Sequence, residues 1–368
     1  MRYFPPPHPD WQRGDPAALG LDAVKIAAAA RFAAEHETPW RRDLAYMIAH
    51  DFAEEPPWNE ALGPVRARGG PNGLVMRGGR IVAEWGDTTQ IDQTFSVAKS
   101  YLSIVGGLAS DRGLIRDLDE PVGRSIDDGG FAPPHNDRIT WRHLLQQTSE
   151  WQGELWGKPD LIDRNRSVAG RPTAGRKGTH RDLQTPGTFW EYNDVRVNRL
   201  ALALLRLWRR PLPDVFRELV MAPIGASPDW EWHGYRNSYV AIDGVRMQSV
   251  SGGSHWGGGV FIHAQDQARI GLLMLRGGEW AGRRILSEEW LAAMREPCPL
   301  YPQYSLLWWL NTGRRLYPSA PESSWCASGA GGNFTWIDPD HDLVAVMRWI
   351  DPAARDEFMR RVIDAIRQ

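Results

Sequence analysis

A serine and a lysine lie three residues apart at the start of an apolar segment with helical spacing. They are Ser96 and Lys99, and residues three apart share one face of a helix. A serine hydroxyl is a weak nucleophile until a neighbouring group takes its proton, and a lysine that has lost its own proton can do this. The spacing therefore predicts nucleophilic catalysis by Ser96, with backbone N–H groups at the helix start stabilising an oxyanion.

Lysine is scarce in this chain, which makes the pairing informative. It occurs only at positions 25, 99, 158 and 177, while arginine supplies nearly all of the positive charge. Arginine cannot replace a lysine that acts as a base, because it stays protonated at any working pH. A helix-start serine followed by a solvated lysine would give the same short pattern, so the rest of the chain has to support the interpretation.

Two further segments offer groups that such a dyad needs. Tyr192 precedes a predicted helix, and a phenol near a lysine ammonium can act as a base or proton shuttle. A core tyrosine followed by an N-capping Asp194 is the alternative there. Ser328, Gly329 and Ala330 lie in a run of small residues, where a substrate carbonyl can approach the backbone and an N–H can complete an oxyanion hole. A glycine-rich turn is the alternative there.

Tryptophan is in notable excess, with 19 residues in the chain. Several lie in polar or glycine-rich stretches, which indicates an aromatic-lined cleft, although most tryptophans pack in the core. Trp151, Trp156 and Trp256 are the candidates for the cleft. His255, beside Trp256 in a glycine-rich segment, is a further candidate for lining it.

The composition excludes several classes of partner. A formal charge of −2 gives no electrostatic reason to expect nucleic acid or an anionic membrane surface. No segment approaches the ~20 apolar residues of a membrane span, and the N-terminus lacks the apolar core of a secretory signal. If Met1 is the native start, a cytoplasmic protein with reduced Cys298 and Cys326 is expected. The ten histidines form no metal-ligand spacing, so no metal or other cofactor is expected. The oligomeric state stays open.

The expected elements place strands near both ends of the chain and helices between them. A hairpin is predicted over 73–85 with its turn at Gly78-Gly79, and three strands over 323–349. Helices are predicted over 21–35, 41–53, 96–112, 141–147, 195–209, 212–220, 266–275, 287–295 and 352–366. Residues 157–187 are predicted to form a long loop, which in a compact domain is usually functional or disordered.

These elements predict an α+β fold, with an antiparallel β-sheet flanked by helices and an inserted, mainly helical region. Residues 20–113 and 246–368 would form the α/β core domain. Residues 114–245 would form the helical insert, and residues 1–19 an irregular lead. A cleft for a small-molecule substrate is expected between the core and the insert.

In combination and in this order, the motifs resemble those of the serine β-lactamase and penicillin-binding-protein superfamily. The motifs are Ser96-Val97-Ala98-Lys99, Tyr192-Asn193-Asp194 and the small-residue run at 326–333. The similarity is greatest to the branch of class C β-lactamases, family VIII-type esterases and aminohexanoate-dimer hydrolases. It extends to residues 144–151, to residues 256–259 and to the terminal hairpin, and it implies a β-lactamase/transpeptidase-like fold.

The resemblance also implies roles for the candidate residues. Ser96 would be the acylated nucleophile, and Lys99 and Tyr192 would activate it and then the deacylating water. The N–H groups of Ser96 and Ala330 would bind the oxyanion. Asp194, together with Ser328 and Gly329, would contact the substrate.

Two departures from the family pattern bear on the substrate. Asp194 stands where many relatives carry asparagine, and Ala327 lacks the cation that helps to hold a β-lactam carboxylate. Both departures favour an esterase or amidase that cleaves a small, less anionic ester or amide. The alternatives are a true β-lactamase or D-amino-acid peptidase and, from another class, a catalytically inactive binding protein on the same fold.

Overall fold

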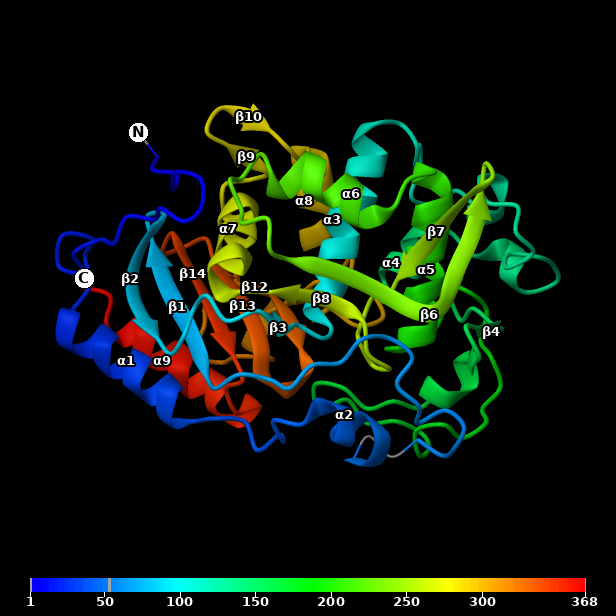
Figure 1. The fold of residues 1–368 in the computed structure, drawn as a ribbon, viewed down its shortest axis with the longest axis horizontal. Helices are drawn as coiled ribbons and strands as arrows, with labels where there is room; N and C mark the ends of the chain where they lie inside the picture. The colour runs from blue at the N-terminus through cyan, green and yellow to red at the C-terminus, as the bar shows by residue number, and fades with distance from the viewer. Residues whose placement is uncertain (1, 52–53, 368) are drawn as a thin grey trace.

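In the computed structural model, which describes residues 2–51 and 54–367, a six-stranded antiparallel sheet forms the part that Figure 1 shows at the left. Its strands, in spatial order, are β11 (Trp309–Leu310), β12 (Trp325–Gly329), β13 (Asn333–Asp338), β14 (Leu343–Arg348), β1 (Asn72–Arg77) and β2 (Arg80–Trp85). Ala345 of β14 pairs with Val75 on one side and with Trp336 on the other. The N-terminal hairpin and the C-terminal strands thus join in one sheet, as predicted.

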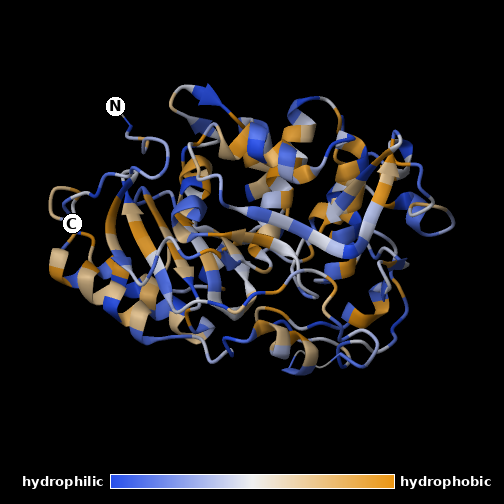
Figure 2. Cartoon of the chain, viewed as in Figure 1, coloured by the Kyte–Doolittle hydropathy of each residue, from blue (hydrophilic) through white to orange (hydrophobic). Residues whose placement is uncertain are grey.

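Helices cover both faces of this sheet. On one face α1 (Ala23–Glu35) packs against α9 (Arg355–Asp364) and against β1 and β2. On the other, α7 (Ala264–Leu275) packs against β1, β13 and β14, and α3 (Val97–Asp111) packs against β12 and β13. Apolar residues follow the strands between these helices (Figure 2). The predicted fold class, an antiparallel sheet flanked by helices, is confirmed.

A second antiparallel sheet lies beside the first and contains an unpredicted strand. Its order is β3 (Asp92–Gln93), β8 (Gly259–Ile262), β6 (Glu231–Ile242) and β7 (Val245–Val250). Strand β6 lies in the range 114–245, for which only helices were expected. Its register with β7 shifts between Gly234 and Tyr239, which interrupts the two-residue alternation by which a strand is recognised in sequence.

The other elements are short apart from helix α5. The remaining helices are α2 (Leu44–Tyr46), α4 (Trp141–Leu145), α5 (Asp194–Trp208), α6 (Leu212–Phe216) and α8 (Glu288–Arg295). Two small hairpins pair β4 (Glu154–Leu155) with β5 (Lys158–Pro159) and β9 (Glu279–Trp280) with β10 (Arg283–Arg284). The helix expected over 41–53 becomes α2 and a π-helical turn to Asp51, and its expected end at Ala53 lies outside the described residues. The domain boundaries at 114 and 245 stay predictions.

Residues 164–193, all of which the structure describes, form a loop without helix or strand. Buried ion pairs fix its path. Glu150, whose side chain is fully buried, accepts hydrogen bonds at 2.6 Å from both terminal nitrogens of Arg181 and from Arg196 Nη1 of α5. Arg181 also pairs with Glu191 at 2.7 Å. Glu150 therefore connects the loop to α5, the helix that begins two residues after Tyr192.

Replacing Glu150 by glutamine tests how much these ion pairs stabilise the fold. Burial disfavours the Glu150 carboxylate, but Arg181 and Arg196 more than offset this and lower its pKa to about 2. Because the folded-state pKa lies below the unfolded one, the stabilisation is present above about pH 4.5 and is lost as the pH falls towards 2. We expect Glu150→Gln to reduce the free energy of unfolding by about 3 kcal/mol at pH 7.

Urea unfolding of both proteins between pH 7 and pH 2.5 measures this effect. The difference between wild type and Glu150→Gln should shrink as the pH falls. Glu154→Gln, at an exposed glutamate of the neighbouring hairpin, is the control and should change stability by less than about 0.5 kcal/mol. A difference of the same size at every pH would contradict the assignment.

Two expectations from composition can be compared with the fold. Within the described residues, no helix is both long enough and apolar enough to cross a membrane. Cys298 and Cys326 are buried and unpaired. Burial raises the pKa of both thiols, which makes them poor nucleophiles.

Candidate active site

Ser96 occupies the N-cap position of α3, and its hydroxyl does not cap the helix. The preceding residue, Phe95, has a φ of +53°, which is uncommon for a residue other than glycine. Its buried ring lies edge-on to Trp40 at 5.3 Å and to Trp349 at 6.2 Å between ring centroids. This packing holds the left-handed backbone turn that places Ser96 at the helix start.

Lys99 lies one turn into α3 and is 1% exposed. Its Nζ donates a hydrogen bond of 2.8 Å to Ser96 Oγ and another to the carboxylate of Asp194, the first residue of α5. The same Nζ lies 4.8 Å from the centroid of the Tyr192 ring. The structure thus brings the predicted nucleophile, lysine and tyrosine together with Asp194, which follows Lys99 by 95 residues.

Asp194 is surrounded by basic side chains. Arg166 Nη1 of the 164–193 loop donates to Asp194 Oδ2, and His255 Nδ1 lies 3.6 Å from the same oxygen. Burial disfavours the charged form, but the charges of Lys99 and Arg166 outweigh it and hold the pKa of Asp194 well below its usual range. Asp194 is therefore ionised at neutral pH. His255, predicted to line the cleft, thus lies beside Asp194, and its contact with a substrate stays a prediction.

The ion pairs continue outward from Asp194. Asp163 Oδ2 accepts from Arg166 Nη1 at 3.1 Å, and Asp163 Oδ1 lies 3.2 Å from Lys177 Nζ. Lys177 donates to Glu54 at 2.7 Å, and His255 Nε2 lies 2.6 Å from the same carboxylate oxygen. We call the alternating cations and carboxylates of this set the charge cluster: Lys99, Asp194, Arg166, Asp163, Lys177 and Glu54. Three charges of each sign offset one another beside the nucleophile.

The end of β12 lies directly against the start of α3. A β-carbon at Gly329 would come within 2.1 Å of the Thr94 carbonyl oxygen and 3.2 Å of Ser96 N, so only glycine fits. The next residue, Ala330, lines the space beside Ser96. This arrangement is compatible with an oxyanion hole formed by the N–H groups of Ser96 and Ala330, which stays a prediction.

Two pockets open on Ser96, and both are lined by Arg166 and Ala330. The larger one has a volume of about 430 Å³, and we call it the Arg355 pocket. Its other lining residues include Val168, Ala169, Tyr192, Trp309, Arg315, Leu316, Tyr317, Ser328, Gly329 and Arg355. The smaller one, the His255 pocket, has about 330 Å³ and is also lined by Asp51, Phe95, Ser167, Lys177, Asp194, Gly253 and His255.

The Arg355 pocket carries positive charge without a balancing carboxylate. Arg355, at the start of α9, is 7% exposed and donates to Ser328 Oγ at 3.2 Å and to the Gly329 carbonyl oxygen at 3.3 Å. Neither Arg355 nor Arg315 forms an ion pair with a described residue, and no described Asp or Glu lines this pocket. Ala327 itself offers no charge, as the sequence indicates, but Arg355 brings a cation to the third motif from another element.

The three candidate tryptophans do not reach the pockets that open on Ser96. Trp151 is buried and donates its indole N–H to the Gly130 carbonyl oxygen at 2.7 Å, and Trp256 donates its own to Glu54. Trp156 lies in the turn between β4 and β5. The tryptophan that lines the Arg355 pocket is instead Trp309, which stacks on Tyr192 at 5.7 Å between centroids.

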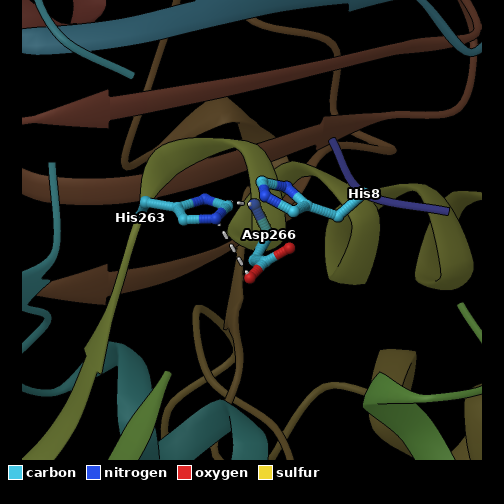
Figure 3. A group of neighbouring side chains, drawn as sticks. All are labelled: His8, His263 and Asp266. Atoms are coloured by element: carbon cyan, nitrogen blue, oxygen red, sulfur yellow. Dashed lines mark hydrogen bonds and ion pairs between the residues drawn. The ribbon is translucent and has the colours of Figure 1, made fainter. Parts of the chain in front are cut away.

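Two groups of described side chains have the spacing of metal ligands. In one of them, His8, His263 and Asp266 lie together at the start of α7 (Figure 3). His263 Nδ1 accepts the backbone N–H of Asp266 at 3.1 Å, so the neutral ring carries its proton on Nε2 and offers no lone pair to a metal. The other group belongs to the charge cluster and already surrounds the Lys177 ammonium. This chemistry does not fit a metal at either place.

Comparison with known proteins identifies the family of this chain. Residues 65–363 match the family model for β-lactamase. The chain is 30% identical over 317 residues to the 6-aminohexanoate-dimer hydrolase of Paenarthrobacter ureafaciens, which covers 77% of this chain and 73% of that protein. The chain belongs to the β-lactamase family and is a serine hydrolase.

Solved structures share the fold at low sequence identity. EstCE1, a hydrolase with promiscuous acyltransferase activity, matches with a TM-score of 0.60 and 16% identity, over 94% of this chain and 99% of that one. A penicillin-binding protein homologue from Caulobacter crescentus matches with a TM-score of 0.57 and 14% identity, over 92% and 97% of the two chains. At these identities the likeness concerns the fold alone.

Proposed function

We propose that this protein hydrolyses a small ester or amide through an acyl-enzyme on Ser96. The supporting observation is the 2.8 Å hydrogen bond from Lys99 Nζ to Ser96 Oγ, at a helix start that opens on two pockets. Similarity to a 6-aminohexanoate-dimer hydrolase supports an amide as substrate. An inactive binding protein would not need a buried lysine hydrogen-bonded to the serine hydroxyl.

The proposed reaction has two halves. Ser96 Oγ forms a bond to the substrate carbonyl carbon, and its proton passes to the Lys99–Tyr192 pair. The N–H groups of Ser96 and Ala330 bind the oxyanion until it collapses, when the pair returns the proton to the departing alcohol or amine. Water then attacks the acyl carbon and gives a proton to the same pair. The bond from the acyl carbon to Ser96 Oγ breaks as the pair returns that proton to Oγ, and the acid product leaves.

A fluorophosphonate probe tests this assignment without knowledge of the substrate. Intact-protein and peptide mass spectrometry should find one adduct, on the peptide that contains Ser96. Ser96→Ala should abolish the adduct, while Ser103→Ala, which changes a buried serine farther along the same helix, should leave it. A folded wild-type protein without an adduct would support the inactive binder.

The uncompensated arginines favour a second candidate, a β-lactamase or D-amino-acid peptidase. In both cases the substrate carries a carboxylate, and Arg315 and Arg355 lie in the pocket that could receive it. A charge-assisted hydrogen bond contributes about 1.5–3 kcal/mol. By transition-state arithmetic this corresponds to about one to two powers of ten in kcat/KM.

Matched substrates measure this contribution. We expect wild type to hydrolyse the p-nitrophenyl monoester of glutaric acid with a kcat/KM about tenfold or more above that of p-nitrophenyl butyrate. Arg355→Gln should remove most of this preference, because the neutral amide cannot pair with the carboxylate. Nitrocefin extends the comparison to a β-lactam.

The result distinguishes the two interpretations of the third motif. If neutral esters are preferred by wild type and by Arg355→Gln alike, the earlier expectation of a less anionic substrate holds. If the anionic ester and nitrocefin both have a higher kcat/KM than p-nitrophenyl butyrate, the result supports a β-lactamase or D-amino-acid peptidase. Arg361→Gln, at a partly exposed arginine on the same helix α9 that pairs with Glu357, is the matched control and should not change the ratio.

A further inference from the structure

We propose that Arg166 and Asp194 are positioning residues that set the protonation of the Lys99–Tyr192 pair in opposite directions. Arg166 favours the pair that has lost one proton and can receive another from Ser96, while Asp194 favours the fully protonated pair. The inference rests on the proposed function, because it concerns the base that acts on Ser96. It adds a residue from the long loop to the residues that the motifs identify.

Arg166 contacts both members of the site. Its Cζ lies 5.1 Å from the centroid of the Tyr192 ring, and its Nη1 donates to the Asp194 carboxylate that also accepts from Lys99. Lys99 Nζ lies 4.8 Å from the same ring. A cation at such distances favours the anionic phenolate and disfavours a second cation on Lys99. Both effects drive a proton off the pair.

Asp194 acts on the same pair with the opposite sign. Its carboxylate accepts from Lys99 Nζ, which favours the ammonium, and it adds negative charge to the site in which Lys99 contacts the Tyr192 ring, which disfavours the phenolate. An asparagine at this position would keep the shape of the side chain without the charge. The departure from the family's asparagine therefore changes the electrostatics of the base while keeping the hydrogen-bonding geometry to Lys99.

The position of Arg166 fits this role better than a purely structural one. The loop has other attachments, since Arg181 binds Glu150 and Glu191, and Lys177 binds Glu54. Arg166 lines both pockets that open on Ser96. Its side chain keeps 18% exposure, so its charge faces the space in which the substrate reacts. Loss of this one guanidinium should leave the loop in place.

Other charged groups also face the pair, and they come from several elements. They are Asp163 and Lys177 around the loop, Glu54 from the N-terminal segment, His255 after β7, and Arg315 and Arg355 across the larger pocket. Of these, the histidine is the type of side chain that ordinarily changes charge between pH 5 and 8. A His255→Gln profile therefore has to be measured alongside the others to identify its contribution.

The test follows the second-order rate constant of fluorophosphonate labelling from pH 5 to pH 10. The acidic limb of this profile reports the proton that must leave the pair. In Arg166→Gln the limb should move to higher pH by about one unit, and in Asp194→Asn to lower pH by about one unit. Arg166→Lys should keep the limb near its wild-type position, because the charge is retained.

Arg171→Gln is the matched control on the same loop. Its guanidinium lies 4.8 Å from the centroid of the Trp190 ring and donates to the Trp190 carbonyl oxygen at 3.1 Å, so its loss should not move the limb. Opposite displacements of the limb in Arg166→Gln and Asp194→Asn support the proposal. The proposal would be overturned if the variants were labelled more slowly without a shift of the acidic limb. It would also be overturned if the limb moved in the same direction in Arg166→Gln and Asp194→Asn.

Two outcomes concern folding and the proposed function. If Asp194→Asn does not fold, Asp194→Glu replaces it and should keep the wild-type limb, and the displacement in Arg166→Gln then decides. Wild-type protein that is not labelled at Ser96 overturns the proposed function and this inference together. Labelling at Ser96 with a limb that no charge variant moves overturns only the role of Arg166 and Asp194.

Discussion

Ser96→Ala is expected to slow the hydrolysis of the best substrate by a factor of roughly a thousand or more. The variant lacks the oxygen that forms the acyl-enzyme, and only binding and the oxyanion site remain to assist a direct attack by water. The fold should not change, because the Ser96 hydroxyl does not cap α3. Steady-state kinetics and urea unfolding on the same preparation measure both quantities.

The control for Ser96→Ala is again Ser103→Ala. Ser103 lies two turns farther along α3, is fully buried and lines neither pocket at the nucleophile. Its turnover should stay within about twofold of wild type, since a surface or core change of this size rarely costs more than about 1 kcal/mol. Ser96→Ala activity within tenfold of wild type would mean that another residue is the nucleophile.

Lys99→Arg should be almost as damaging as Lys99→Ala, although it keeps the positive charge. A group that takes the serine proton has to lose its own first, and an arginine does not do so at any working pH. The guanidinium is also larger than the ammonium, and Lys99 is 1% exposed between Ser96 and Asp194. We expect both variants to lose a factor of about a hundred or more in kcat/KM.

Measurements of stability and of probe labelling distinguish loss of the base from disruption of the site by the altered side chain. Lys99→Ala leaves Asp194 with Arg166 as its remaining close ion-pair partner, so both thermal stability and probe labelling should fall. Lys158→Arg, at another buried lysine that binds backbone carbonyl oxygens, controls for the larger side chain. If Lys99→Arg retained good turnover, Lys99 would act as a fixed charge and Tyr192 would be the base.

The residues that the sequence identifies are those that local spacing brings together. Ser96 and Lys99 are three apart on one helix, so their contact follows from helix geometry alone. The strands at 73–85 and 323–349 alternate or run apolar over their whole length, and their pairing in one sheet follows from the fold class. The motif around Tyr192 predicts that this residue belongs to the site, and its ring lies beside Lys99 Nζ.

The residues that the sequence does not identify reach the site through long-range contacts. Arg166 lies in a loop without periodicity, and Arg355 lies at a helix start 27 residues after Ser328, so neither position differs from the other arginines in sequence. The tryptophans fail for a related reason. Trp256 lies in a glycine-rich segment as a cleft residue would, yet its indole is buried on Glu54. Polar or glycine neighbours in sequence therefore do not determine whether a tryptophan is exposed in the folded protein.

The division of the space around Ser96 into two pockets separates specificity from reactivity. The larger pocket takes Arg315, Leu316 and Tyr317 from a connection between β11 and β12 that contributes nothing to the charge cluster. A library at Leu316 and Tyr317, with the charge of Arg315 kept because it faces the base, can change which substrate is accepted while the protonation of the base stays as it is. The two properties can therefore be selected in successive rounds of directed evolution, provided that Arg166 and Ala330, which line both pockets, are kept.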